Sequence, residues 1–170
     1  MQKPQASEHN PYFSRYIDLV PAGNYAELLQ QNTDKAIKSF KSIAPEKHNY
    51  AYAKGKWTVK EMLMHMIDTE RVMAYRALVA ARGDSKTQLY GMDENAYAQN
   101  VNVTNRTMDD LLEEFSAVRT ATKKLFENLD EEQSKRTSHI VNHHTTARAL
   151  GYLIIGHVEH HINILNERYL

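Results

Sequence analysis

Three histidines are the residues of this chain best suited to chemistry: His65, His157 and His161. His157 and His161 are four residues apart in an apolar stretch with the pattern of a helix, so their rings project from one face. His65 falls on the inward stripe of an earlier helical segment. If the facing turns of these two segments lie at the same height, the three imidazoles converge in the core.

Such a set of neutral imidazoles predicts a site for a divalent metal ion, with Zn or Ni expected first and Fe, Mn or Co as alternatives. Three protein ligands leave a coordination position open, which is the arrangement of catalytic rather than structural zinc. Asp68 follows His65 by three residues and is the candidate catalytic carboxylate, acting as a base, a hydrogen-bond acceptor or a further ligand. The alternative is that each histidine is a hydrogen-bonded core residue without a metal.

The other histidines and the nearest acid fit the site less well. His160 is turned about 100° from His157 around the helix axis, so we expect a neighbour of the site rather than a ligand. Glu159 points about 200° away from His157, and the H-E-x-x-H pattern of metalloproteases is absent. Three further histidines precede the last helix in a segment expected to be a solvated loop: His139, His143 and His144.

Four long helical patterns position these residues, and no run has the alternating pattern of a β-strand. They cover residues 24–43, 58–82, 107–129 and 145 to near the C-terminus. The second opens with a capping box, Thr58 with Glu61, and stops at Gly83. The sequence therefore predicts an all-α fold, a four-helix bundle, in one domain over residues 1–170 with a lead-in segment at 1–20.

The connection between the second and third helices is long, at residues 83–106. About 24 extended residues reach about 80 Å, whereas a helix of about 25 residues is about 37 Å long. This connection can therefore cross the whole bundle and let the third helix run parallel to the second.

Composition excludes several classes of function. Lys plus Arg equals Asp plus Glu, 21 each, so no global charge favours nucleic acid or an anionic membrane surface. The chain has no cysteine, which excludes disulfides, Cys-ligated metals and a Cys nucleophile. Any thiol chemistry must use a thiol brought in as substrate. No secretory signal pattern or membrane span is evident, so the expected location is cytoplasmic.

Five short segments together resemble one known family: GKWTVKE (55–61), HMIDTER (65–71), YRAL (75–78), MDENAY (92–97) and GHVEHH (156–161). In order and spacing the chain resembles the DinB-like superfamily of metal-binding four-helix bundles, from about residue 50 to 169. The branch it most resembles is that of the bacillithiol transferase of YfiT type, whose members are also described as metal-dependent hydrolases.

The resemblance implies a metal triad at His65, His157 and His161, an up-down-down-up helix order with a crossover between helices 2 and 3, and homodimers. It does not imply DNA binding. The expected function is a metal-dependent enzyme that transfers a low-molecular-weight thiol to an electrophilic small molecule. One alternative is a metal-dependent hydrolase of amide or ester bonds, with Asp68 or a residue of the Asp93–Glu94 segment as the base. The other is a non-enzymatic, metal-stabilised stress-response bundle.

Overall fold

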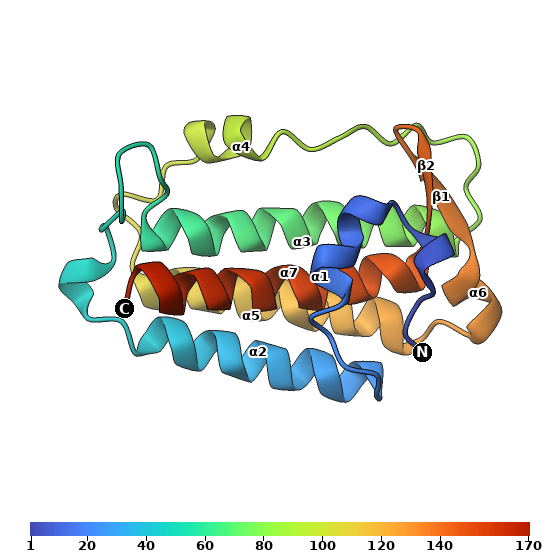
Figure 1. The fold of residues 1–170 in the computed structure, drawn as a ribbon, viewed down its shortest axis with the longest axis horizontal. Helices are drawn as coiled ribbons and strands as arrows, with labels where there is room; N and C mark the ends of the chain where they lie inside the picture. The colour runs from blue at the N-terminus through green and yellow to red at the C-terminus, as the bar shows by residue number, and fades with distance from the viewer.

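A bundle of four long helices forms the body of the molecule in the computed structural model, which describes all residues 1–170 (Figure 1). The elements in chain order are η1 (Ala6–Glu8), η2 (Pro11–Phe13), α1 (Ser14–Ile17), α2 (Tyr25–Lys41), η3 (Pro45–Lys47), α3 (Val59–Ala81), α4 (Glu94–Asn100), α5 (Met108–Glu127), α6 (Glu131–Lys135), β1 (Thr137–Ile140), β2 (His143–Thr146) and α7 (Ala147–Arg168). The bundle consists of α2, α3, α5 and α7, so the predicted four-helix bundle is confirmed. None of these helices combines the length and apolar character that a membrane crossing requires.

Side-chain caps set where the long helices begin. The Thr58 hydroxyl accepts a hydrogen bond from the Glu61 backbone N–H at 3.2 Å, and the Glu61 carboxylate accepts one from the Thr58 N–H at 2.7 Å. Thr107 caps α5 and Thr146 caps α7 through their hydroxyls. Just past the end of α3, Gly83 has a φ of 68°, a left-handed conformation that glycine adopts without steric cost. These local signals are why the predicted starts of these helices agree with the structure.

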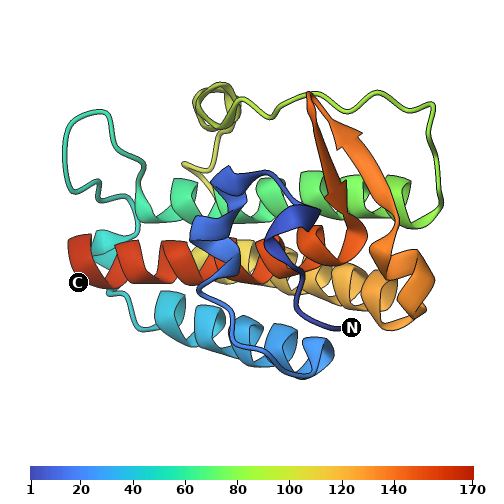
Figure 2. The ribbon, with the colours of Figure 1, turned by 45° about the vertical axis from the view of Figure 1, so that its right-hand side comes forward.

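The four long helices run in two directions. In Figure 1, α2 and α7 run from right to left, and α3 and α5 run from left to right. The order along the chain is therefore up, down, down, up. Between α3 and α5 the chain passes back over the outer side of α3 and forms the short α4 on the way (Figures 1 and 2).

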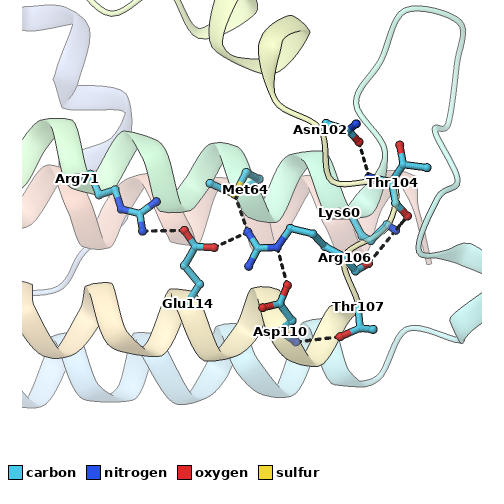
Figure 3. Close-up of polar contacts among 9 residues, drawn as sticks. All are labelled: Lys60, Met64, Arg71, Asn102, Thr104, Arg106, Thr107, Asp110 and Glu114. Carbon is cyan, nitrogen blue, oxygen red and sulfur yellow. Dashed lines mark hydrogen bonds and ion pairs between the residues drawn. The ribbon is translucent and has the colours of Figure 1, made fainter.

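The end of this crossover is tied to both helices that it joins (Figure 3). Lys60 of α3 donates to the backbone carbonyls of Thr104 and Arg106, at 2.9 and 3.1 Å. Arg106 pairs with Asp110 and with Glu114 of α5. Glu114 also accepts from Arg71 of α3 at 2.7 Å. These contacts fix the register of the parallel pair α3 and α5.

A buried polar layer divides the apolar core into two clusters, one towards each end of the bundle. Each long helix contributes to this layer where its apolar stripe is interrupted: Asn32, Glu70, Arg119 and His157. Within it, Arg119 Nε lies 2.9 Å from Glu70 Oε2, and both side chains are almost fully buried. The polar layer crosses the middle of the bundle, at the height where α7 carries its first site histidine.

One expectation from the sequence is wrong. The segment before α7, expected to be a loop, forms an antiparallel hairpin of β1 and β2, in which His139 pairs with His144. Neither four-residue strand alternates apolar and polar residues over a length that reveals a strand. The turn begins with Val141 at φ 56°, where a hairpin sequence typically shows Gly or Asn. The fold is thus all-α apart from one small hairpin.

The lead-in segment packs across α7 (Figures 1 and 2). Glu8 pairs with Arg148 near the start of α7, with 2.6 Å from Arg148 Nε to Glu8 Oε2. Farther along, the lead-in approaches the helix so closely that a Cβ added to Gly156 would lie 2.1 Å from the Tyr16 carbonyl oxygen. Gly156 therefore lets the lead-in lie directly against the site.

Candidate metal centre

The structure brings His65 of α3 together with His157 and His161 of α7. The Nε2 atom of His157 lies 3.1 Å from that of His65 and 3.1 Å from that of His161. A nitrogen from each of the three rings lies within 4.8 Å of the other two. All three side chains are buried, at 6 to 7% exposure. The convergence expected from helical spacing is thus present.

Burial keeps the three imidazoles neutral. Desolvation, with a smaller contribution from His160, lowers the pKa of His65 to about 4. Desolvation also lowers the pKa values of His157 and His161 well below the ordinary value, and the neighbouring histidines add to this. A neutral imidazole has a free lone pair on one ring nitrogen, which is the form that binds metal ions.

The donor arrangement fits a cation better than a network of hydrogen bonds. Each neutral imidazole has one N–H and one acceptor nitrogen. His157 Nε2 faces two other Nε2 atoms at 3.1 Å, but it has only one in-plane direction for a hydrogen or a lone pair. Hydrogen bonds therefore cannot satisfy both contacts, whereas a shared cation accepts three lone pairs together. The residues present fit a divalent metal ion.

Aromatic packing, rather than carboxylates, orients the rings. Trp57 lies over His65 with the ring centroids 4.4 Å apart. Tyr16 of the lead-in meets His157 and His160 edge-on, at 5.7 and 5.2 Å. The Nδ1 atoms of His65 and His161 have no hydrogen-bond partner in the protein. No carboxylate therefore holds either ring in the way common at metal sites.

A cavity of about 620 Å³ opens beside His157. Its walls come from the lead-in, α3, the crossover, the hairpin and α7, and include Tyr16, Arg76, Glu94 and Val141. Its volume is within the range of small-molecule sites. The site therefore combines a buried donor set with a cavity large enough for a small molecule.

The predicted catalytic carboxylate lies apart from the three histidines. Asp68 Oδ1 is 3.4 Å from Arg71 Nη1, and Arg71 also pairs with Glu114 of α5. Burial raises the pKa of Asp68, and Arg71 opposes this shift. Asp68 neither lines the cavity nor bonds to a histidine.

The remaining histidines considered from the sequence, and Glu159, lie outside the three-histidine cluster. His160 packs against Tyr16 beside the cluster. Glu159 accepts hydrogen bonds from Asn32 and Lys35 of α2, away from the cluster. Of the three exposed histidines in the hairpin, His143 lines the cavity, while His139 and His144 stack at 4.2 Å.

Sequence reasoning missed most of the cavity wall. Tyr16 and Val141 reach it from segments that show no motif, and only the fold brings them to His157. Arg76 could have been noticed, because an arginine on the inward stripe of a core helix is unusual. Its position in the sequence predicts that the side chain is buried, but does not predict the cavity that it lines.

Comparisons with known proteins agree with this fold. A family model described as DinB superfamily matches residues 28–165. No curated protein matches the sequence. A solved structure from Bacillus subtilis, described as "YfiT … a probable metal-dependent hydrolase with an unusual four-helix bundle topology", is similar with a TM-score of 0.73 and 18% identity, over 97% of this chain and 90% of that one.

A second solved structure is the mycothiol-dependent maleylpyruvate isomerase. It is similar with a TM-score of 0.64 and 14% identity, over 82% of this chain and 58% of that one. At these identities the two structures show a shared fold and leave the reaction of this chain to be argued from its own site.

Proposed function

Because the chain belongs to the DinB superfamily, we propose that it is a metal-dependent enzyme that transfers a low-molecular-weight thiol to an electrophilic small molecule. His65, His157 and His161 hold the divalent ion. The observation that carries this proposal is the convergence of three buried, neutral imidazoles on one point beside a cavity. The mycothiol dependence of a structurally similar isomerase supports a small thiol as substrate.

Each part of the site has a role in this proposal. A divalent ion bound there stabilises a thiolate at neutral pH, which makes the thiol nucleophilic. The three neutral histidines supply lone pairs without first losing protons. Trp57 and Tyr16 pack against the rings and limit the access of water. The chain has no cysteine of its own to compete with the substrate thiol.

Acid–base help can come from the crossover. Asp93 and Glu94 both line the cavity. The Asp93 carboxylate already accepts two backbone N–H groups as the cap of α4. The Glu94 carboxylate has no ion-pair or hydrogen-bond partner in the protein, so it is available to take a proton from the substrate. Of the carboxylates considered from the sequence, Asp68 is the weaker candidate because it pairs with Arg71 and does not line the cavity.

Hydrolysis of an amide or ester is the second candidate. The same donor set would bind and acidify a water molecule, and Glu94 supplies the carboxylate that such a reaction needs. If hydrolysis is the reaction, Glu94→Gln should lower kcat at least tenfold, whereas Asp68→Asn should not. The reverse order would restore Asp68 as the base.

Thiol transfer is tested with metal-loaded protein, a panel of small thiols and the chromogenic electrophile 1-chloro-2,4-dinitrobenzene. We expect metal-dependent formation of the thioether, in which the thiolate sulfur displaces chloride from the ring and the thiol proton is released. His157→Ala should abolish it, and His139→Ala, which changes an exposed histidine outside the cluster, should not. Absence of a metal-dependent product across the panel would contradict the proposal.

A purely structural metal site is distinguished with the cobalt-substituted protein. If the ion has an open position, adding a small thiol changes the visible spectrum. A spectrum that does not change when ligands are added would favour the non-enzymatic bundle.

The proposal also includes Zn or Ni as the ion, a cytoplasmic location and a homodimer. Elemental analysis of untagged protein, localisation of a tagged copy and sedimentation test these three points.

A further inference from the structure

Arg76 is a buried cation that faces the cavity. Its side chain is 5% exposed and belongs to the cavity wall, on the α3 stripe that also carries Met73. Arg76 Nη2 donates to the Tyr90 carbonyl oxygen at 2.6 Å, and Nη1 contacts the Met73 sulfur at 3.4 Å. No carboxylate pairs with the guanidinium. Burial lowers the pKa of Arg76, and Tyr97 is the only ionisable neighbour that opposes this shift.

The other two buried arginines of the chain show what Arg76 lacks. Arg119 pairs with Glu70 at 2.9 Å, and Arg148 pairs with Glu8 at 2.6 Å. Buried charges are normally paired in this way, because desolvating an unpaired ion is costly. One carbonyl and one thioether leave most of the five N–H donors of Arg76 without a partner, and none of the donors has a charged acceptor. The cavity lies where the missing anion would be.

The remaining charges of the cavity determine which anion fits. The Asp93 carboxylate is engaged as the cap of α4. Glu94 is an exposed residue of the same cavity wall, and it forms no ion pair with Arg76. One cation facing the cavity matches a single negative charge better than a phosphate dianion. A planar guanidinium also matches a carboxylate through two parallel hydrogen bonds.

We propose that Arg76 binds a carboxylate of the substrate and so selects acidic small molecules for this site. The inference deepens the proposed function and rests on it. Arg76 lies eleven residues after His65 on the same helix, which is three turns or about 16 Å along the axis. The substrate is therefore extended, with its carboxylate at Arg76 and its reactive group near His157.

A first experiment tests this binding without metal or thiol. Metal-free protein is titrated with hexanoate and with hexanamide, which has a similar size and no charge. NMR follows the backbone amide signals of the cavity wall in every variant and, in the wild type, also the Arg76 Nε–Hε signal, which is assigned by its absence in Arg76→Lys. We expect the wild type to bind hexanoate at least tenfold more tightly than hexanamide, since a charge-assisted bidentate pair discriminates by about this factor or more.

Three comparisons make the result specific. Arg76→Gln should bind acid and amide equally, and Arg76→Lys should keep part of the preference. Arg82→Gln, which removes an exposed arginine at the end of α3, should behave as wild type. The alternative is that Arg76 serves only to hold the crossover in place through its hydrogen bond to the Tyr90 carbonyl. In that case the wild type binds hexanoate no more tightly than hexanamide, and the inference fails. Tighter binding of hexyl phosphate than of hexanoate would overturn the carboxylate assignment.

A second experiment finds which substrate carries the carboxylate. Metal-loaded protein is assayed with 3-mercaptopropionate and its methyl ester, and with acceptors in acidic and esterified forms. Arg76→Gln should raise KM at least tenfold for the acidic form of one substrate, with little change in kcat. A rise in KM that is equal for acids and esters would contradict the inference.

The two proposals fail in different ways. Loss of metal-dependent transfer, with the preference for hexanoate intact, overturns the reaction but not the carboxylate site. Transfer by a protein that binds hexanoate and hexanamide equally overturns the role of Arg76 but not the reaction.

Discussion

The three candidate ligands are held mainly by the packing of their rings. Trp57 covers His65, and Tyr16 meets the edge of His157, while no carboxylate bonds to either ring. Their burial lowers their pKa values, so the metal-free protein already has the lone pairs that an ion needs. Removing a proton from a ligand is therefore not part of metal binding at neutral pH.

The two adjacent histidines of α7 should differ in their effect on metal content. His161→Ala removes a nitrogen of the cluster, whereas His160→Ala removes a half-buried ring that packs against Tyr16. We expect His161→Ala to lower the metal bound per chain at least tenfold and His160→Ala to leave most of it. Elemental analysis of the two variants after equal metal loading measures this. Equal losses would argue against the assignment of ligands.

The stability of the metal-free protein should depend on pH through these histidines. In the unfolded chain a histidine titrates near pH 6.5, whereas the folded protein lowers the pKa of His65 to about 4. Between these values the unfolded chain binds more protons, so the free energy of unfolding falls as the pH is lowered through this window.

We expect a loss of at least about 1 kcal/mol between pH 7 and pH 5, since each unit of pKa shift corresponds to about 1.4 kcal/mol. Urea unfolding of metal-free protein at several pH values measures it. His65→Gln should reduce the slope, whereas His139→Gln, which changes an exposed side chain, should not. A stability that stays constant over this range would contradict the expected neutrality of the cluster.

At the scale of elements, the site depends on how closely the lead-in approaches α7. The Tyr16 carbonyl occupies the space that a side chain at position 156 would need. The same approach places the Tyr16 ring against His157 and makes it part of the cavity wall. One glycine therefore allows both the packing of α1 and the enclosure of the site.

Gly156→Ala should separate the lead-in from the bundle. The added Cβ would lie 2.1 Å from the Tyr16 oxygen, so the backbone of α1 must move. We expect a loss of about 1–3 kcal/mol, as is typical of overpacking, and faster proteolysis within the first 20 residues. Gly23→Ala is the control, because its nearest contact, Leu28 at 3.4 Å, is a flexible side chain. Normal protection of the lead-in in Gly156→Ala would show that it packs more loosely than described.

The sequence was sufficient for elements whose signals are local. Thr58, Thr107 and Thr146 each cap a helix through the hydroxyl, so the helix starts could be predicted within a residue or two. The hairpin could not, because Val141 stands at a turn position where glycine or asparagine is the usual signal. The shared face of His157 and His161 on α7 followed from helical spacing. The cavity beside them did not, since its walls come from segments far apart in the chain.

For the whole molecule, the site lies where the apolar core is interrupted. Glu70, Arg119 and Asn32 share the buried polar layer with His157 and separate the two apolar clusters. The buried ion pair between Glu70 of α3 and Arg119 of α5 forms in only one register of these helices, which favours a single alignment of the bundle. A metal ion at this level would join α3 to α7, two helices that run in opposite directions.

Metal removal should therefore lower global stability. An ion that binds only the folded state stabilises it by about 4 kcal/mol when present at about a thousand times its Kd. For a chain of this size that corresponds to a Tm difference of about 10 °C. Calorimetry with and without a chelator measures the shift. The Tm of His157→Ala should not change when the chelator is added. A wild-type Tm that is the same with and without the chelator would argue against a metal at this site.

The packing of Trp57 on His65 has a consequence for how the protein can be observed. Trp57 is the only tryptophan of the chain, and its ring lies 4.4 Å from the His65 ring, centroid to centroid. The tryptophan emission of the protein therefore originates beside the three-histidine cluster. An ion with unpaired electrons, such as Co²⁺, would quench this emission, while the filled d shell of Zn²⁺ provides no such route. The unlabelled protein thus carries an optical reporter that signals both the occupancy of its centre and the electronic class of the ion.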